Sequence, residues 1–518
     1  MSYKKGVDKS QFTLLPVCLD DYIPDDHICR VISAFVNQLD MKELGFKYAE
    51  HEDIGNRPYD PRMMLSLYIY GYLHRIRSSR RLEAETHRNI EVMWLMDELT
   101  PNNKTICNFR KDNTKSLMSV FREFNLLCKN LSLFGGKLTA TDGTKFRANN
   151  SRKNNHNKIT VEKTLSYIDK KITEYMNALE EADSSDSVGT NGLERSSDEI
   201  KEILKKLKER KAKFESFSSR LKTEEEISTI DPDSRLMHSG GDARPLDVCY
   251  NVQTIVDSKH CLIVDFEVSA RADDKGNLDN MTKKAKEVMG VEKLTNLADK
   301  GYYDGEDIVS CESKGVTCLV AKPKSGGGNQ EKGFKREQFV YDREKNCYIC
   351  PCKKELSFKR EEEKDKKKYY VYNNFPACQE CEVRAKCTSS RYRNILRISY
   401  QDTLDIVDKR TQEKRELYNK RQAIVEHVFG TIKSVWGYKQ CLCRRKPKVE
   451  AEISLSYLCY NFRRVLNIYG ENIKELIGAM RIYSSFFFNF LIKLNIIRKI
   501  SIFLKNKGRQ LQFNHFRD

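Results

Sequence analysis

Residues 247–320 alternate between two kinds of segment, and this alternation constrains the fold more than any other feature of the sequence. DVCYNVQTIVDSKHCLIVDFEVSA, at 247–270, is rich in Val, Ile and aromatic residues, which is typical of two antiparallel strands joined at Asp257-Ser258. A helix is expected from about Asn280, followed by a strand, a loop and a helix in KLTNLADKGYYDGEDIVSCESKG and a strand in VTCLVAKP. Strands that alternate with helices predict a mixed α/β sheet.

A further strand and a helical region precede this alternating part. GGKLTATDGTKFRA, at 135–148, is typical of a strand that ends at Asp142 and is followed by a glycine turn. Upstream, Asp60 as N-cap and Pro61 at the first helical position predict a helix start, and the apolar run MMLSLYIYGYLHRI predicts that this helix is buried. We expect a second helix in SSRRLEAETHRNIEVMWLMDEL.

A polar turn and a short basic helix, TPNNKTICNFRKDN, end the helical region and carry Arg110 and Lys111. A helix, a turn and a basic helix are compatible with a DNA-binding helix-turn-helix. The alternative is an ordinary small helical bundle with a charged, solvated face. DNA contact through Arg110 and Lys111 is therefore one of two interpretations of this region.

Two polar insertions interrupt the α/β part. In the first, apolar residues about 3.5 positions apart in two segments, with Ser196 and Glu199 as a capping box, predict a helical hairpin. The second contains a strongly charged stretch and six cysteines. The expected order is a helical domain at 1–134, core segments at 135–157, 229–322 and 401–470, the hairpin at 158–228, the cysteine-rich insertion at 323–400, and a basic, apolar tail at 471–518.

Positive charge is concentrated near the C-terminus. The chain of 518 residues has 92 Lys and Arg against 74 Asp and Glu, a net charge of +18. Residues 409–518 alone hold 23 basic and 8 acidic residues, a net charge of +15, and include the run RRKPK with Arg444 and Arg445. Because Lys and Arg neutralise phosphates and release counterions, this distribution predicts that a nucleic acid lies against the C-terminal part.

The cysteines and the apolar runs bear on the compartment. No apolar run reaches the ~18 residues that span a bilayer, and the first residues contain no secretory signal, so we expect no membrane association. Seventeen cysteines in a chain of this length favour free thiols in a reducing cytoplasm.

Three acidic residues stand in apolar surroundings. Asp142 and Asp299 are placed at the ends of predicted strands, and Glu426 lies within a helix predicted over 410–435, which has no breaker until Gly430. Buried carboxylates are costly unless they are paired, protonated or bound to a metal. If the three converge, they form a hard-oxygen site for Mg²⁺ or Mn²⁺. The alternative is three separate structural acids, because acids at strand ends are common.

Five segments in a fixed order resemble the DDE transposases of bacterial insertion sequences. They are ATDGTKFRANNS, DPDSRLM, YNVQTIVDSKHCLIVDFEV, LADKGYYDGEDI and AIVEHVFGTIK. The chain is most similar to the IS1182-like group within the IS4/IS5-type families, over about residues 10–470. The resemblance implies an RNase H-like core, in which the two insertions and the helical N-terminal domain are additions.

The resemblance also implies roles for individual residues. Asp142, Asp299 and Glu426 correspond to the catalytic acids that hold two divalent ions. The family's pattern around the glutamate aligns with Tyr418, Arg421 and Lys433 as DNA contacts, although Arg421 is one position further from Glu426 than the pattern expects and Gln422 occupies the expected place. Trp436 either stacks on a flipped base or is a core residue.

The implied activity is metal-dependent cleavage and strand transfer on double-stranded DNA. Water attacks at the transposon end and frees a 3′-OH, which then attacks target DNA, with two protein copies working as a homodimer across two terminal inverted repeats. A bacterial cytoplasmic, nucleoid-associated location follows from this resemblance. The alternatives are a DNA-binding descendant without catalysis and an RNase H-like nuclease that cleaves without joining.

The cysteines of the second insertion have metal-ligand spacing. CYIC and CQEC are two C-x-x-C pairs about 27 residues apart, as in four-thiolate zinc ribbons. The candidate ligands of a structural Zn²⁺ are Cys347, Cys350, Cys378, Cys381 and Cys387, and Cys352 competes for a place in the first pair. The alternative is a group of free buried thiols.

Overall fold

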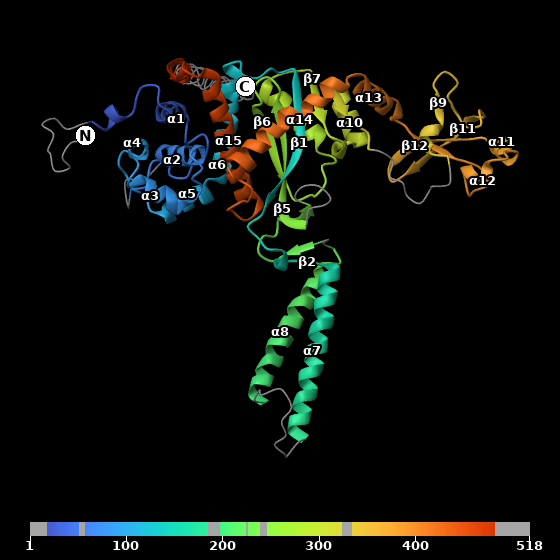
Figure 1. Ribbon diagram of the computed structural model, residues 1–518, viewed down its shortest axis with the longest axis horizontal. Helices are drawn as coiled ribbons and strands as arrows, with labels where there is room; N and C mark the ends of the chain where they lie inside the picture. Colours follow the sequence, from blue (N-terminus) through green and yellow to red (C-terminus); the bar gives the residue numbers. More distant parts are fainter. Residues whose placement is uncertain are drawn as a thin grey trace, which may run out of the picture.

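A computed structural model describes residues 18–50, 57–184, 197–223, 226–238, 246–323 and 334–481 of the chain. Figure 1 shows four parts: a helical lobe in blue, a central sheet, a long helical hairpin that projects away from the sheet, and a second, smaller sheet on the side opposite the lobe. No helix within the described residues is long and apolar enough to cross a membrane. The predicted N-cap Ser196 and the tail beyond residue 481 lie outside the described residues.

The helical lobe confirms the expected character of the N-terminal region. Its helices are α1 (Ile28–Asn37), α2 (Pro61–Leu73), α3 (Ser79–Thr86), α4 (Ile90–Leu95), α5 (Asn103–Asp112) and α6 (Thr114–Asn130). Helix α2 begins as predicted, with the Asp60 side chain accepting a hydrogen bond from the Arg62 amide, and it is buried along almost its whole length. The single helix expected after it is wrong: α3 ends at Thr86, and Asn89 caps a new helix, α4, by accepting from the Glu91 amide.

The central sheet confirms the mixed α/β prediction. Its strands are β1 (Leu138–Arg147), β4 (Arg235–His238), β5 (Leu246–Asp257), β6 (Ile263–Ser269), β7 (Leu294–Ala298) and β8 (Val316–Val320). β4 and β6 pair antiparallel with the first and second halves of β5, and β5 pairs antiparallel with β1. On its other edge β1 pairs parallel with β7, and β7 pairs parallel with β8. The six-stranded sheet therefore has the order β6-β5-β1-β7-β8, with β4 beside the first half of β5, and it combines antiparallel pairs with the parallel pairs β1-β7 and β7-β8.

Helices flank this sheet and connect it to the lobe. They are α9 (Leu278–Met289), α10 (Gly305–Ser313), α13 (Gln401–Glu413), α14 (Arg415–Phe429) and α15 (Lys446–Tyr469). The prediction of a helix from 410 without a breaker until Gly430 is wrong at Lys414, where the chain leaves the helical conformation between α13 and α14. At Gly430 the α-helix ends, and a π-helix, η5 (Gly430–Val435), follows. α15 packs against α6, α2 and β6. There the buried Asn461 amide donates to Asn125 Oδ1 at 2.8 Å and accepts from the Ile263 N–H at 2.8 Å, which joins lobe, helix and sheet.

The first insertion is a helical hairpin on a small two-stranded base. Helices α7 (Lys158–Ser184) and α8 (Ser197–Arg220) run antiparallel below the paired strands β2 (Asn155–Asn157) and β3 (Glu226–Ser228) (Figure 1). Val161, Ile168, Phe214 and Phe217 form the buried contact near this base. The hairpin's remaining length is largely exposed, so it buries little against the rest of the molecule.

The second insertion folds as a separate antiparallel sheet. Its strands are β9 (Val340–Asp342), β10 (Cys347–Ile349), β11 (Glu355–Lys364), β12 (Lys367–Asn373) and β13 (Ile395–Ile398), and the short helices α11 (Phe375–Gln379) and α12 (Arg384–Cys387) lie between β12 and β13. The remaining short elements are the 3-10 turns η1 (Leu19–Tyr22), η2 (Arg152–Asn154), η3 (Lys300–Tyr302) and η4 (Arg336–Gln338). Arg397 of β13 pairs with Asp402 and Asp405 of α13, which connects this sheet to the central one.

Candidate active site

The register of β1 and β7 brings Asp142 and Asp299 side by side. Thr141 of β1 pairs with Ala298 of β7, and each aspartate is the next residue of its strand. Parallel neighbours lie about 4.8 Å apart, so the two carboxylates leave the sheet at one level. The prediction that β1 ends at Asp142 is wrong. β1 continues to Arg147 because β5 stays paired with it, whereas β7 ends at Ala298 and leaves the other edge of β1 open from Asp142 onward.

Glycines next to the aspartates make room for the acid cluster. The Gly143 N–H donates to Asp142 Oδ1 at 2.8 Å, and the Gly301 N–H donates to Asp299 Oδ1 at 2.8 Å. A Cβ on Gly143 would collide with the carboxylate of Asp274, and a Cβ on Gly301 would lie 2.9 Å from Asp299 Oδ1. Both positions therefore require the absence of a side chain, which gives the Asp-Gly and Asp-Lys-Gly sequences a structural reason.

Asp274 is a third acid of the cluster, and the sequence reasoning missed it. It lies in the loop between β6 and α9, where no periodicity marks it. Its Oδ1 accepts from Asn251 Nδ2 at 2.8 Å and from Gln253 Nε2 at 2.6 Å, and Lys145 Nζ lies 3.5 Å from it. The available signal was the pair Asn251 and Gln253, since two amides on one face of a buried strand need a polar partner.

Burial and crowding of like charges shift the protonation of the cluster. The pKa of Asp142 is raised to about 6: burial is the main cause and the charges of Asp299 and Asp274 add to it, whereas Arg421 and the Gly143 N–H oppose the shift. Arg421 Nη1 lies 3.0 Å from Asp142 Oδ2. Burial, followed by the charges of Asp274, Asp142 and Asp299, also raises the pKa of Tyr302, whose hydroxyl donates to Gln253 Oε1. The cluster is therefore short of positive charge.

Helix α14 packs against β1 and β5 and presents Arg421 to the cluster. Arg421 lies about 140° around the helix from Glu426, so the two residues occupy different faces. Glu426 is exposed, and its Oε1 accepts from Gln422 Nε2 at 2.7 Å. Of the hydrogen bonds and ion pairs among the described residues, none joins Glu426 to Asp142 or Asp299. The structure thus brings together Asp142, Asp299, Asp274 and Arg421, with Glu426 on the helix beside them.

Several residues predicted to contact DNA are packed inside the protein. Lys433 Nζ donates to Thr144 Oγ1 at 2.5 Å and to the Lys145 carbonyl at 2.6 Å, and burial lowers its pKa to about 8. Arg110 is 8% exposed and donates to the Tyr72 hydroxyl. These two cations stabilise the fold around them. Tyr418 and Trp436 are each 9% exposed, and Trp436 packs edge-on against Tyr438, as the core interpretation of Trp436 predicts.

The other predicted DNA contacts remain on the surface. Lys111 is exposed at the end of α5. Arg444 and Arg445 are exposed just before α15, where Arg444 Nε donates to the Asn149 carbonyl at 3.0 Å and the Arg445 amide donates to Asp231 Oδ1 at 2.9 Å. The Arg444 guanidinium therefore lies close to the end of β1, on the basic C-terminal part of the chain.

Two family models and a solved structure match this chain. The model of a transposase domain matches residues 17–112, and the model of a transposase DDE domain matches residues 349–466. The search of curated proteins found no match. A cryo-EM structure of the piggyBac transposase synaptic complex with hairpin DNA aligns with 90% of this chain and 82% of that chain, at 9% identity and a TM-score of 0.30, which is too low to bear on the fold.

The two matched regions correspond to distinct parts of the structure. The first spans the helical lobe from α1 to α5, and the second spans most of the second insertion, α14 with Glu426, and most of α15. A DDE domain implies dependence on divalent metal ions. These two matches support the interpretation of the chain as an insertion-sequence DDE transposase.

Proposed function

We propose that Asp142, Asp299 and Glu426 are the catalytic acids of this transposase, which cleaves double-stranded DNA at the ends of an IS1182-like insertion sequence and joins it to a target. The observation that carries the proposal is the placement of Asp142 and Asp299 at one level of the sheet, where β1 loses its neighbour β7. The strand order β6-β5-β1-β7-β8, with three antiparallel strands followed by two parallel ones, supports an RNase H-like core.

The donor set fits hard divalent cations. Mg²⁺ and Mn²⁺ prefer carboxylate oxygens, and Asp142, Asp299 and Glu426 offer them. The raised pKa of Asp142, caused by burial and by Asp299 and Asp274, indicates that added positive charge would stabilise the cluster. These three residues would hold two such ions, which when bound activate the attacking oxygen and stabilise the leaving oxygen.

Neighbouring side chains orient the acids and balance their charge. The Gly143 and Gly301 amides each donate to one carboxylate oxygen of Asp142 and Asp299, and Arg421 pairs with the second oxygen of Asp142. Arg421 balances the charge of Asp142, and Gln422 orients Glu426. Arg421 is therefore proposed to act on Asp142 and not as the phosphate contact that the family pattern suggests.

The basic surface supports the placement of DNA. Arg444 and Arg445 are exposed close to the end of β1 and belong to the segment that carries most of the net charge, and Lys111 is exposed on the helical lobe. Cations near an acidic cluster attract and position phosphates. Two copies of the chain, one on each inverted repeat, would form the synaptic homodimer.

The test is a cleavage and joining assay with the full chain. Labelled DNA that carries the inverted repeats flanking the gene is incubated with the protein, a target plasmid and Mg²⁺. We expect cleaved ends and joined products, and loss of both with Asp142→Ala but not with Asp273→Ala, an exposed aspartate next to the cluster that pairs with Arg271. Cleavage without joining would indicate a nuclease. DNA binding without cleavage, unchanged by Asp142→Ala, would contradict the catalytic proposal.

A further inference from the structure

Part of the second insertion has almost nothing buried to hold it together. The sheet β9–β13 has a small core of Phe339, Tyr348, Leu356, Tyr372 and Ile395. The segment between β12 and β13 contains only α11 and α12, with five and four residues, and neither has a buried residue. Helices this short are unstable alone. Some other interaction must fix this segment against the sheet.

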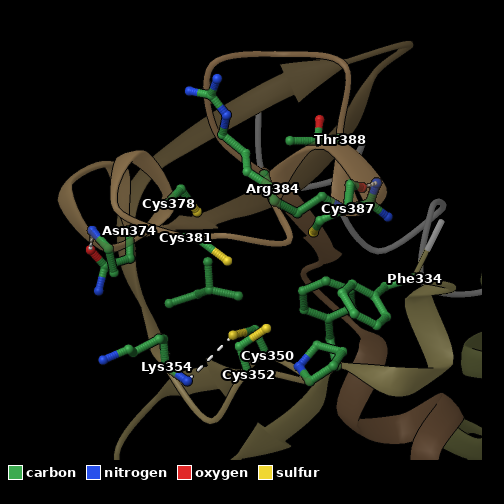
Figure 2. A pocket seen from close by; sticks show the side chains of 15 residues that line it. Phe334, Cys350, Cys352, Lys354, Asn374, Cys378, Cys381, Arg384, Cys387 and Thr388 are labelled. Carbon is green, nitrogen blue, oxygen red and sulfur yellow. Dashed lines mark hydrogen bonds between the residues drawn. The ribbon is translucent and has the colours of Figure 1, made fainter.

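Five cysteines converge where this segment meets the sheet. Cys350 and Cys352 stand on the turn after β10, Cys378 on α11, Cys381 just beyond it, and Cys387 at the end of α12. Figure 2 shows their sulfur atoms around one shared pocket. Cys347, the first cysteine of the predicted pair, does not line this pocket, because it lies within β10, and the tight turn after that strand brings in Cys352 instead.

We propose that this pocket binds one structural Zn²⁺ through the thiolates of Cys350, Cys378, Cys381 and Cys387, with Cys352 as a fifth, adjacent thiol. All seventeen cysteines are free in the structure, so no disulfide occupies these sulfurs. Four thiolates in tetrahedral geometry form a closed structural zinc site. The site joins the turn after β10 to α11 and α12, the two helices that bury no residue.

The lining of the pocket selects a soft cation. It contains no aspartate or glutamate, so hard ions such as Mg²⁺ and Ca²⁺ have no carboxylate ligands there. Three cations line it instead: Lys354, Arg384 and Arg393. Arg393, whose guanidinium donates to the Cys387 carbonyl, offsets part of the formal charge of −2 that four thiolates around one dication carry. The pocket is therefore built for an anionic thiolate centre.

Individual contacts support the choice of ligands. The Lys354 N–H donates to Cys350 Sγ at 3.3 Å, a contact that favours the thiolate. Arg393 Nη1 donates to the Cys387 carbonyl at 3.3 Å, and its Nε is buried without a partner among the described residues, near the sulfurs. Cys378, Cys381 and Cys387 line the same pocket as Cys350.

The test measures the metal content of the full-length protein. We expect about one zinc per chain by inductively coupled plasma mass spectrometry, and loss of at least four fifths of it in Cys378→Ser and Cys381→Ser. Cys347→Ser is the matched control, since Cys347 is buried in the same sheet outside the pocket, and it should keep its zinc, as should Cys352→Ser and Asp142→Ala. Replacement of zinc by Co²⁺ should give the intense sulfur-to-cobalt absorption of a four-thiolate site.

Three outcomes would overturn the proposal. One is protein without zinc in which Co²⁺ produces no thiolate absorption, and another is full zinc content in Cys381→Ser. The third is a thiol titration that finds these cysteines oxidised to disulfides in freshly purified protein. Loss of zinc in Cys352→Ser with retention in Cys350→Ser would overturn the choice of ligands. Circular dichroism on each variant separates loss of the metal from loss of the whole fold.

Discussion

The acid cluster and the cysteine cluster of this chain offer metal-ligand chemistry of opposite kinds, and they differ most in what holds them. Asp142 and Asp299 follow paired residues of β1 and β7, two strands of a hydrogen-bonded sheet flanked by buried helices. The five thiols stand on a turn and on two short helices that bury nothing. The fold thus builds the acid cluster before any ligand arrives, whereas the cysteine segment depends on what it binds.

The charged residues around the acid cluster and around the cysteine cluster also differ. The acids crowd together and keep Arg421 and Lys145 as partial counter-charges, an arrangement that suits exchangeable ions on an open strand edge. The thiols lie together within one pocket beside Arg393, an arrangement that suits a permanent ion. On these two proposals, the chain keeps a catalytic metal and a structural metal at different sites. The sites differ in the hardness of their ligands and in the rigidity of the elements that carry those ligands.

The largest effect should come from the acid cluster. Asp299→Asn removes a charge that the bound ions require and keeps the side-chain shape, so DNA cleavage should fall by about 10³-fold or more, because metal assistance contributes several kcal/mol to the transition state. Single-turnover cleavage of end-labelled DNA measures this. Zinc content and thermal stability should stay as in the wild type. Equal loss of zinc would show that the two clusters are not independent.

The second prediction concerns the cysteine cluster, where a substitution should affect the second insertion and leave the central sheet unchanged. Cys381→Ser should leave the central sheet folded but release the segment between β12 and β13, so amide hydrogen exchange over residues 374–394 should accelerate by about 10²-fold or more. Exchange mass spectrometry on the full chain, with Cys347→Ser alongside, measures it. Unchanged protection in this segment would mean that packing, and not the metal, holds α11 and α12.

Asp274 sharpens the description of the acid cluster. Asp274→Asn removes a charge that crowds Asp142 and an acceptor for Asn251 and Gln253, so it should change the apparent Mg²⁺ affinity by about 10-fold, in the range found for outer ligands of metal sites. A Mg²⁺ titration of the cleavage rate measures this change. Asp273→Ala serves as the control. A titration identical to the wild type would remove Asp274 from the site.

The smallest effect is a pH dependence of Mg²⁺ binding, which we expect at the acid cluster. The pKa of Asp142 is raised to about 6, so protons compete with metal ions below that value, and Mg²⁺ affinity should fall by up to about tenfold per pH unit below pH 6 and level off above about pH 7. In the metal-free protein the folded state holds this proton more tightly than the unfolded state, so stability should decrease as pH rises from about 4 to 6. Calorimetric titrations at several pH values check the first expectation. Affinity independent of pH between 5 and 7 would contradict it.

The sequence predicted the components of the acid cluster better than their geometry. Strand patterns identified the segments of Asp142 and Asp299, but the end of β7, and not the end of β1, opens the site. Asp274 lies on a loop without periodicity, and only its amide partners on β5 could have indicated it. Charge alone could not show that Lys433 and Arg110 are buried, because burial depends on how helices and strands pack.

Sequence spacing also predicted the residues of the cysteine cluster only in part. The C-x-x-C spacing favoured Cys347 with Cys350, yet spacing does not show where a strand ends. Cys347 belongs to β10, whereas the turn at Lys353, with its positive φ, brings Cys352 beside Cys350. The second pair, Cys378 and Cys381, together with Cys387, lines the pocket, because its residues lie on short helices with no competing strand.

The most direct test of the proposed catalytic site is to locate the exchangeable metal on the chain. Fe²⁺ substituted for Mg²⁺, with ascorbate and peroxide, generates hydroxyl radicals that cut the backbone beside the bound ion. Cuts next to Asp142 and Asp299 are predicted, with none at residues 350–387, and they should disappear with excess Mg²⁺ or in Asp142→Ala. Cuts that persist in Asp142→Ala, or that fall only in the cysteine-rich insertion, would contradict the assignment of Asp142 and Asp299 as the catalytic metal ligands.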